Sequence, residues 1–294
     1  MSETTDHPLT ANGFDFRVRL YPAAEPNGST LVWLHGGAFL FGTIEMPEAD
    51  EVAKRLSAAG TTVVSVDYTL GPVDALPPLP PRRDGEAGPD PEQVAAELAA
   101  AGPRSPYPTA SLQTVEAFRW ATEHASDWGG DAEQVSLGGA SAGGNLSAGA
   151  TVRLRDGGDA LPACLVLVYP VLHATLPPMD DELAGFLRGL PGGGGLPPEA
   201  GQAINDVYLA GASPMEVYAF PGGHDMRGMP RTLILTAEFD GLRPSAEAFA
   251  ADLVRGGVDV RVVRERGAAH GYLNEIGDPS AEHTLSLIAG ALSD

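Results

Sequence analysis

The residues best suited to covalent chemistry form the segment Gly139-Ala140-Ser141-Ala142-Gly143, which has the pattern Gly-x-Ser-x-Gly. Segment 134–137 before it predicts a strand, and segment 142–155 after it predicts a helix. A serine on a sharp turn between strand and helix holds its hydroxyl above the sheet, and the helix directs its first N–H groups at the same point. We predict that Ser141 is a nucleophile for acyl transfer; the alternative is a glycine-rich helix start with an incidental serine.

A second segment suited to this chemistry is Leu34-His35-Gly36-Gly37-Ala38-Phe39, directly after the predicted strand 31–35. Acyl transfer places negative charge on the former carbonyl oxygen, which needs fixed N–H donors about 3 Å away. Two of Gly36, Gly37 and Ala38, together with Ala142, are the predicted donors of this oxyanion hole. The alternative is an ordinary turn after a strand, and His35 is expected to be structural in either case.

Strand-like and helix-like segments alternate after the first fifteen residues, within which no element is predicted. The predicted strands are 16–21, 31–35, 61–67, 134–137, 164–169, 232–237 and 258–263. The predicted helices are 48–59, 109–126, 142–155, 245–255 and 281–292. This alternation predicts an α/β fold, with a mainly parallel central sheet flanked by helices, in one domain over 1–294.

Two stretches rich in proline and glycine interrupt this alternation, at about 73–106 and 172–215. Loops of this length are uncommon in compact domains unless they form lids or linkers. Because the strand and helix pattern resumes after each stretch, we expect both to be cap or lid excursions from the single domain.

Several motifs together resemble the hormone-sensitive-lipase-like branch (bacterial esterase family IV) of the α/β-hydrolase superfamily. They are His35-Gly-Gly-Ala-Phe39, Asp67-Tyr-Thr-Leu70, Gly139-Ala-Ser-Ala-Gly-Gly-Asn-Leu146, Thr236-Ala-Glu-Phe-Asp-Gly-Leu-Arg243 and His270-Gly-Tyr272. The resemblance implies the α/β-hydrolase fold, with His270 as the base for Ser141 and Asp240 as the carboxylate that orients it. It also implies a carboxylic-ester hydrolase that needs no cofactor.

Other residues could compete for these roles. Glu238 is the alternative carboxylate, two residues before Asp240. The remaining histidines are expected to be surface or packed residues; they are His7, His124, His173, His224 and His283. No His-x-x-x-His pattern or cysteine pair appears, so no metal site is predicted.

The chain departs from the family pattern at several positions. Ala140 stands where these enzymes usually have an acidic residue or threonine, and Ala38 replaces a glycine. Relatives carry a helical cap segment before the first strand, for which this chain has only about fifteen residues. Some thirty extra residues lie between Pro72 and Tyr107, and we hypothesise that 73–106 supplies part of the missing lid.

The leading functional hypothesis is hydrolysis of small or short-acyl carboxylic esters through an acyl-enzyme. The same residues would serve a lactonase, deacetylase or amidase acting on one metabolite. Relatives that perform elimination typically replace the serine with threonine, so Ser141 weighs against that reaction. A non-catalytic ligand-binding receptor of the same fold is the alternative from another class, but such receptors lack the triad histidine that this chain retains.

The composition of the chain limits the kinds of partner and compartment that we expect. The formal net charge of −21 at pH 7 repels phosphate backbones and anionic lipids, so neither nucleic acid nor a membrane is an expected partner. Cys164 is the single cysteine, and neither a secretion signal nor an apolar run of membrane-spanning length is visible, so a cytoplasmic protein is expected. By resemblance, a homodimer could form through segments 258–263 and 281–292.

Overall fold

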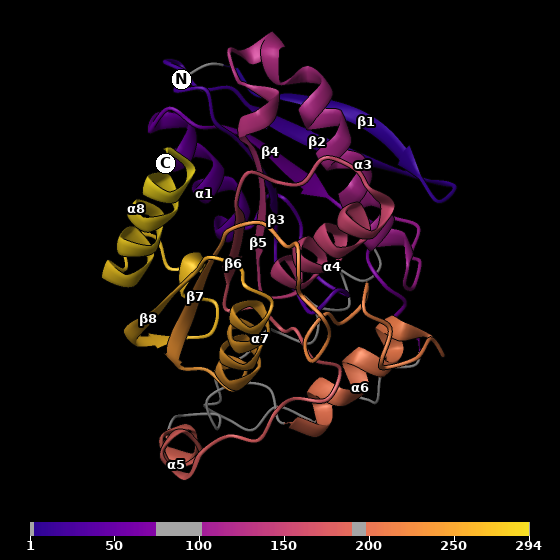
Figure 1. Ribbon diagram of the computed structural model, residues 1–294, viewed down its shortest axis with the longest axis vertical. Coiled ribbons are helices and arrows are strands. Elements are labelled where there is room, and N and C mark those ends of the chain that lie inside the picture. The colour runs from indigo at the N-terminus through magenta and orange to yellow at the C-terminus, as the bar shows by residue number, and fades with distance from the viewer. Residues whose placement is uncertain (1–2, 75–101, 190–197, 294) are drawn as a thin grey trace.

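The computed structural model describes residues 3–74, 102–189 and 198–293, and its centre is an eight-stranded sheet (Figure 1). The strand order is β1-β2-β4-β3-β5-β6-β7-β8, with β1 and β2 antiparallel to their neighbours and the others parallel. The strands are β1 (Thr5–Ala11), β2 (Phe14–Tyr21), β3 (Thr30–Leu34), β4 (Thr62–Asp67), β5 (Val135–Ala140), β6 (Leu165–Val168), β7 (Thr232–Phe239) and β8 (Val260–Ala269). The predicted mainly parallel sheet is confirmed.

Helices cover both faces of the sheet (Figure 1). One face carries α1 (Pro47–Ala58) and α8 (Pro279–Ser293). The other carries α3 (Thr109–His124), α4 (Ala142–Gly157) and α7 (Arg243–Arg255). The short helices η1 (Ala125–Trp128), η2 (Ala132–Gln134) and η4 (Tyr272–Asn274) lie in the connections.

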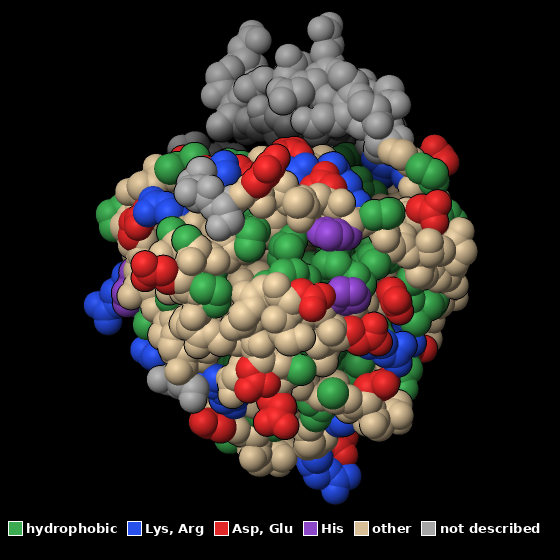
Figure 2. All heavy atoms as spheres, turned by 90° about the horizontal axis from the view of Figure 1, so that it is seen from above, with side chains coloured by type: hydrophobic (Ala, Val, Ile, Leu, Met, Phe, Trp, Pro, Cys, Tyr) green, Lys and Arg blue, Asp and Glu red, His purple; other side chains and the backbone are tan. Residues whose placement is uncertain are grey.

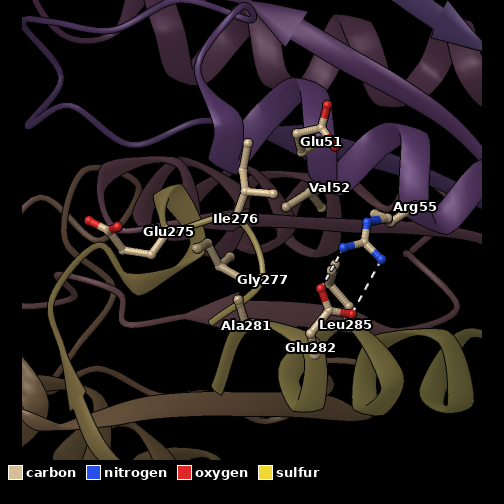
Figure 3. A pocket seen from close by; sticks show the side chains of 10 residues that line it. Glu51, Val52, Arg55, Glu275, Ile276, Gly277, Ala281, Glu282 and Leu285 are labelled. Carbon is tan, nitrogen blue, oxygen red and sulfur yellow. Dashed lines mark hydrogen bonds and ion pairs between the residues drawn. The ribbon is translucent and has the colours of Figure 1, made fainter. Parts of the chain in front are cut away.

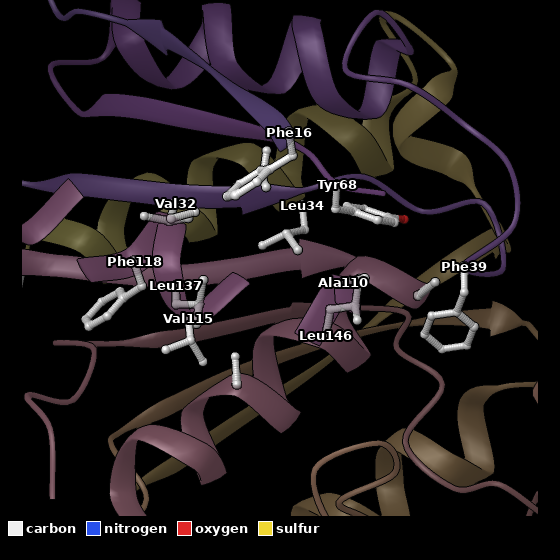
Figure 4. Close-up of a cluster of buried hydrophobic side chains, with 14 of the residues drawn as sticks. Phe16, Val32, Leu34, Phe39, Tyr68, Ala110, Val115, Phe118, Leu137 and Leu146 are labelled. Carbon is white, nitrogen blue, oxygen red and sulfur yellow. The ribbon is translucent and has the colours of Figure 1, made fainter. Parts of the chain in front are cut away.

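The core forms because the central strands are apolar on both faces. Every residue of β3, β5 and β6 is buried, as expected for parallel strands covered by helices on each side. In the cluster of Figure 4, Val32, Leu34 and Leu137 of the sheet meet apolar side chains of α3 and α4, such as Phe118 and Leu146. This packing fixes the ends of β3 and β5, from which the candidate site is built.

The antiparallel strand β1 lies within the first fifteen residues, where the sequence pattern predicts no element. Asn12 and Gly13 join β1 to β2 with φ values of 51° and 75°, so both have the left-handed conformation of a type I′ hairpin turn. Pro8 is tolerated because β1 is an edge strand. The Asn-Gly pair is the sequence signal that could have identified this hairpin.

The excursion at 172–215 contains two helices that were not predicted, α5 (Asp181–Gly189) and α6 (Pro198–Leu209). The Tyr208 ring of α6 stacks on Phe39 at 4.0 Å between ring centres, and the Phe186 ring of α5 lies 5.3 Å from Phe239. The two helices therefore contact the segments that follow β3 and the end of β7. Most of the excursion at 73–106 lies outside the described residues.

Charged side chains are mixed on the face seen in Figure 2, where acidic groups are interspersed with basic ones and are not gathered in one patch. Hydrophobic and histidine side chains occupy the middle of this face. None of the helices in the described parts of the chain is long and apolar enough to cross a membrane.

Candidate active site

Ser141 lies at the turn between β5 and α4 with φ 53° and ψ −115°, an unusual conformation for a residue with a side chain. The neighbouring glycines make this turn possible. A Cβ atom at Gly143 would lie 2.2 Å from the Leu34 carbonyl oxygen, and one at Gly139 would lie 2.5 Å from the Gly143 carbonyl carbon. The backbone packs too closely here for any other residue, which is the strained strand-turn-helix arrangement predicted for the Gly-x-Ser-x-Gly segment.

The structure brings Ser141, His270 and Asp240 together in one line of hydrogen bonds. Asp240 Oδ2 lies 2.9 Å from His270 Nδ1, and His270 Nε2 lies 3.1 Å from Ser141 Oγ. Because the carboxylate can only accept, the Nδ1 atom carries the proton. The Nε2 atom is therefore free to accept the proton of the Ser141 hydroxyl, as a general base must.

The three side chains differ in exposure in the way that this chemistry requires. Asp240 is 2% exposed, and its second oxygen accepts the N–H of Leu242 at 2.8 Å. The His270 side chain is 34% exposed, so the imidazole can exchange protons with a substrate. The buried carboxylate is thus fixed in place and the imidazole remains accessible, whereas Ser141 is 8% exposed.

The charge around His270 favours its protonated form. Desolvation opposes a charged imidazole, but the carboxylates of Asp240 and Glu48 outweigh it and raise the pKa of His270 above the ordinary 6.5. A protonated imidazole at this position is therefore stabilised by the same two carboxylates.

The loop after β3 has three consecutive residues in the left-handed region, with φ values of 112° at Gly37, 54° at Ala38 and 64° at Phe39. A Cβ atom at Gly37 would lie 2.0 Å from the Phe41 carbonyl oxygen, so only glycine fits there. The Leu40 and Phe41 N–H groups donate back to the Gly37 carbonyl and close the turn. Successive N–H groups in such a turn form a concave site suited to an anion.

The predicted oxyanion donors differ in whether their N–H groups already have an acceptor. The Gly36 N–H donates to Glu48 Oε1 at 2.7 Å, which favours Gly37 and Ala38 as the two donors from this loop. No acceptor bonds the N–H of Gly37 or Ala38 within the described residues. Ala142 is the first residue of α4, where an N–H has no partner inside its helix. These three N–H groups remain the proposed donors.

Glu238 and His35, which lie in the sequence motifs of the proposed site, contact other groups in the structure. Glu238 Oε2 accepts the Gly267 N–H, away from the imidazole. His35 is buried, its Nδ1 donates to the Gly36 carbonyl at 2.6 Å, and its ring stacks on Tyr68. Burial lowers the pKa of His35, in keeping with a neutral structural ring.

Two residues near the triad were not identified from the sequence. Glu48, on α1, bonds to the oxyanion loop, and the hydroxyl of Tyr169 donates to Glu48 Oε2 at 2.9 Å. The Tyr169 ring lies 4.8 Å from the His270 ring. No motif marks either residue, since both act through contacts that only the fold creates.

A separate small pocket lies between α1, η4 and α8 (Figure 3). Its lining includes Arg55 and Glu282, which form an ion pair, and the side chain of Ile276. No serine, cysteine or histidine lines it, so it offers no nucleophile for the chemistry above. In the described part of the chain, no group of three or more His, Cys, Asp or Glu side chains could hold a metal ion.

Known proteins resemble this chain over most of its length. The family model for the alpha/beta hydrolase fold matches residues 31–79 and 98–274. An arylesterase of Saccharolobus solfataricus is 27% identical over 300 residues, covering 99% of this chain and 83% of its own. Carboxylesterase NlhH of Mycobacterium tuberculosis is 29% identical over 272 residues, covering 88% of this chain and 72% of its own.

The solved structure of EstE1, a thermostable carboxylesterase cloned from a metagenomic library, superposes with a TM-score of 0.80 at 29% identity. The match covers 99% of this chain and 88% of EstE1. The chain belongs to the alpha/beta hydrolase fold family. The predicted hormone-sensitive-lipase-like family, its fold and its enzyme class, a carboxylic-ester hydrolase, are confirmed.

Proposed function

We propose that this protein hydrolyses small or short-acyl carboxylic esters through an acyl-enzyme formed on Ser141. Ser141 Oγ attacks the ester carbonyl carbon as His270 Nε2 takes its proton. The negative charge that forms on the carbonyl oxygen is held by the N–H groups of Gly37, Ala38 and Ala142. His270 then gives its proton to the leaving alcohol, and a water molecule activated by the same imidazole releases the acid.

The observation that carries the proposal is the unbroken line of hydrogen bonds from Asp240 through His270 to Ser141. A receptor of the same fold would have no use for a base in contact with a strained serine. A lactonase, deacetylase or amidase would use the same residues. The names of the relatives, an arylesterase and carboxylesterases, favour simple esters among these substrates.

The test is hydrolysis of p-nitrophenyl acetate, butyrate and decanoate by the wild-type protein and by Ser141→Ala. We expect turnover of acetate or butyrate to exceed that of decanoate, and the substitution to reduce kcat by at least about 10⁴-fold. Wild-type protein that is labelled stoichiometrically by an ester but does not turn it over would contradict the proposal and favour a receptor.

We further propose that the excursions at about 73–106 and 172–215 form a cap that sets substrate preference. The contact of Tyr208 with Phe39 and that of Phe186 with Phe239 support this role for α5 and α6. Deleting 76–103 should then change the ranking of the p-nitrophenyl esters while Ser141 still reacts with a small phosphonate. An unchanged ranking would contradict the cap proposal.

A cytoplasmic homodimer also stays a proposal. β8 is an edge strand of the sheet, and its Val262 side chain is exposed, which supports pairing of two copies through β8 and α8. Light scattering during size-exclusion chromatography should give twice the mass of one chain for the wild type and the mass of one chain for Val262→Glu.

A further inference from the structure

Glu48 is a carboxylate almost wholly removed from solvent, with 3% of the residue exposed. It accepts one hydrogen bond at each oxygen, from the Gly36 N–H at 2.7 Å and from the Tyr169 hydroxyl at 2.9 Å. No lysine or arginine in the described ranges forms an ion pair with it. Burying a carboxylate without a cation is costly, and hydrogen bonds alone offset that cost here.

Glu48 forms hydrogen bonds with three segments that lie next to the proposed site. Through Gly36 it holds the start of the oxyanion loop, and a Cβ atom at Gly36 would lie 2.6 Å from Glu48 Oε1 and 3.1 Å from Ser141 Cβ. The Glu48 N–H donates to Asn274 Oδ1, four residues after His270. The Glu48 carbonyl accepts the indole N–H of Trp33 in β3.

Glu48 also acts on the base through Tyr169. The Tyr169 ring packs between the His270 ring, at 4.8 Å, and the Tyr272 ring, at 5.1 Å. The hydrogen bond from the Tyr169 hydroxyl to Glu48 therefore fixes the position of a ring that packs against the imidazole. The groups in contact with the imidazole are Asp240 after β7, Ser141 between β5 and α4, and Tyr169 after β6. Tyr272 of η4 and Glu48 contact Tyr169 in turn.

We propose that Glu48 is a positioning residue for the esterase reaction: its carboxylate aligns the Gly36–Ala38 loop with Ser141 and supplies a second negative charge that stabilises the His270 imidazolium. The Gly36 N–H is committed to Glu48, which fixes the orientation of that peptide and leaves the next two N–H groups for the substrate oxyanion. The residue acts through other groups and does not touch the reacting atoms.

Two substitutions separate the two parts of this role. Glu48→Gln keeps the length and can still accept the Gly36 N–H, but it removes the charge. We expect the acid limb of kcat/KM for p-nitrophenyl acetate to move to lower pH, with kcat reduced at least about fivefold. Glu48→Asp keeps the charge but withdraws the carboxylate by one methylene. We expect an unshifted acid limb and a kcat reduced roughly 10- to 100-fold, with KM within about threefold.

Glu51→Gln is the matched control, because Glu51 also lies in α1 and its side chain forms an ion pair with Lys54. It should leave kcat and the acid limb unchanged. Circular dichroism and the stoichiometry of phosphonate labelling verify that each variant is folded. If Glu48→Gln does not fold, the kcat of Glu48→Asp still tests the positioning role.

The inference rests on the proposed function, so wild-type turnover and its loss in Ser141→Ala are measured in the same assay. Absence of that turnover would count against the proposed function itself. With wild-type turnover present, a lowered Tm with unchanged kcat and acid limb in the Glu48 variants would show a purely structural residue and overturn the positioning role.

Discussion

Single residues in this protein carry conformational strain where the chemistry needs it. Ser141 and Ala38 have φ values of 53° and 54°, which residues with a Cβ atom rarely adopt. Ser141 lies at the turn between β5 and α4, and Ala38 lies in the loop after β3 that carries two of the proposed oxyanion donors.

The raised pKa of His270 predicts the pH dependence of the reaction. Only the neutral imidazole can accept the Ser141 proton, so activity is lost on the acid side as the ring becomes protonated. Because Asp240 and Glu48 outweigh desolvation, the midpoint of the acid limb of kcat/KM should lie above 6.5. A pH profile with p-nitrophenyl acetate measures it, and a midpoint below 6.5 would contradict the electrostatic account.

Ala38→Gly should stabilise the protein. The left-handed conformation costs a residue with a Cβ atom about 1–2 kcal/mol, whereas glycine loses about 0.5–1 kcal/mol in added freedom of the unfolded chain. The net gain should raise Tm by roughly 1–3 °C and keep kcat/KM within about threefold. Thermal unfolding followed by circular dichroism tests this, and a lower Tm would show that the alanine is not strained.

The sequence predicted Ser141, Asp240 and His270, which the structure brings within hydrogen-bond distance of one another, because their motifs are local. Ser141 lies within a five-residue pattern, and His270 and Asp240 lie in segments that resemble a known family. Glu48 and Tyr169 could not be identified, since each becomes part of the site only when α1 and the end of β6 pack together. The Gly36 N–H was included among the donors because the sequence does not reveal which acceptor a backbone group will meet.

At the scale of elements, the turn between β5 and α4 tolerates little change in its side chains. The helix packs so closely on the end of β3 that glycine is needed at position 143. Elements with buried apolar runs, such as β3 and β5, could be predicted from composition. The edge strand β1 could not, because it is largely exposed and contains Pro8, so it has no apolar run.

Gly143→Ala should therefore disrupt the site. Its Cβ atom would lie 2.2 Å from the Leu34 carbonyl oxygen and 2.5 Å from that of His35, and backbone atoms cannot move aside easily. We expect kcat/KM to fall by at least about 100-fold and Tm to fall as well. The measurements are p-nitrophenyl acetate hydrolysis and thermal unfolding.

Gly290→Ala is the matched control, because no atom lies within 4 Å of a Cβ atom at this position in α8. Alanine is the better helix former by about 1 kcal/mol, so this variant should have a slightly higher Tm and unchanged kcat/KM. Equal losses in the two variants would mean that the close packing at position 143 is not the cause.

At the scale of the whole molecule, a net charge of −21 at pH 7 sets the response to salt. Folding brings these charges closer together, and on the face in Figure 2 they are spread among basic groups. Surface ion pairs such as Arg17–Asp6, whose side chains are 40% and 37% exposed, contribute little to the free energy of unfolding. Repulsion between acidic groups should outweigh them.

The free energy of unfolding should accordingly increase when NaCl is raised from about 10 mM to about 500 mM at pH 7, because salt screens the repulsion. Urea denaturation measures it, and KCl should give the same increase if screening is the cause. A decrease with salt would indicate that the ion pairs dominate.

The most direct test of the account is to identify the residue that a p-nitrophenyl phosphonate labels. Peptide mass spectrometry should find one phosphonyl group per chain, on Ser141, with p-nitrophenol released in equal amount. His270→Ala should slow the labelling by at least about 100-fold, because no base then accepts the Ser141 proton. A label on another residue, or labelling of Ser141 at the wild-type rate without His270, would contradict the catalytic triad proposed here.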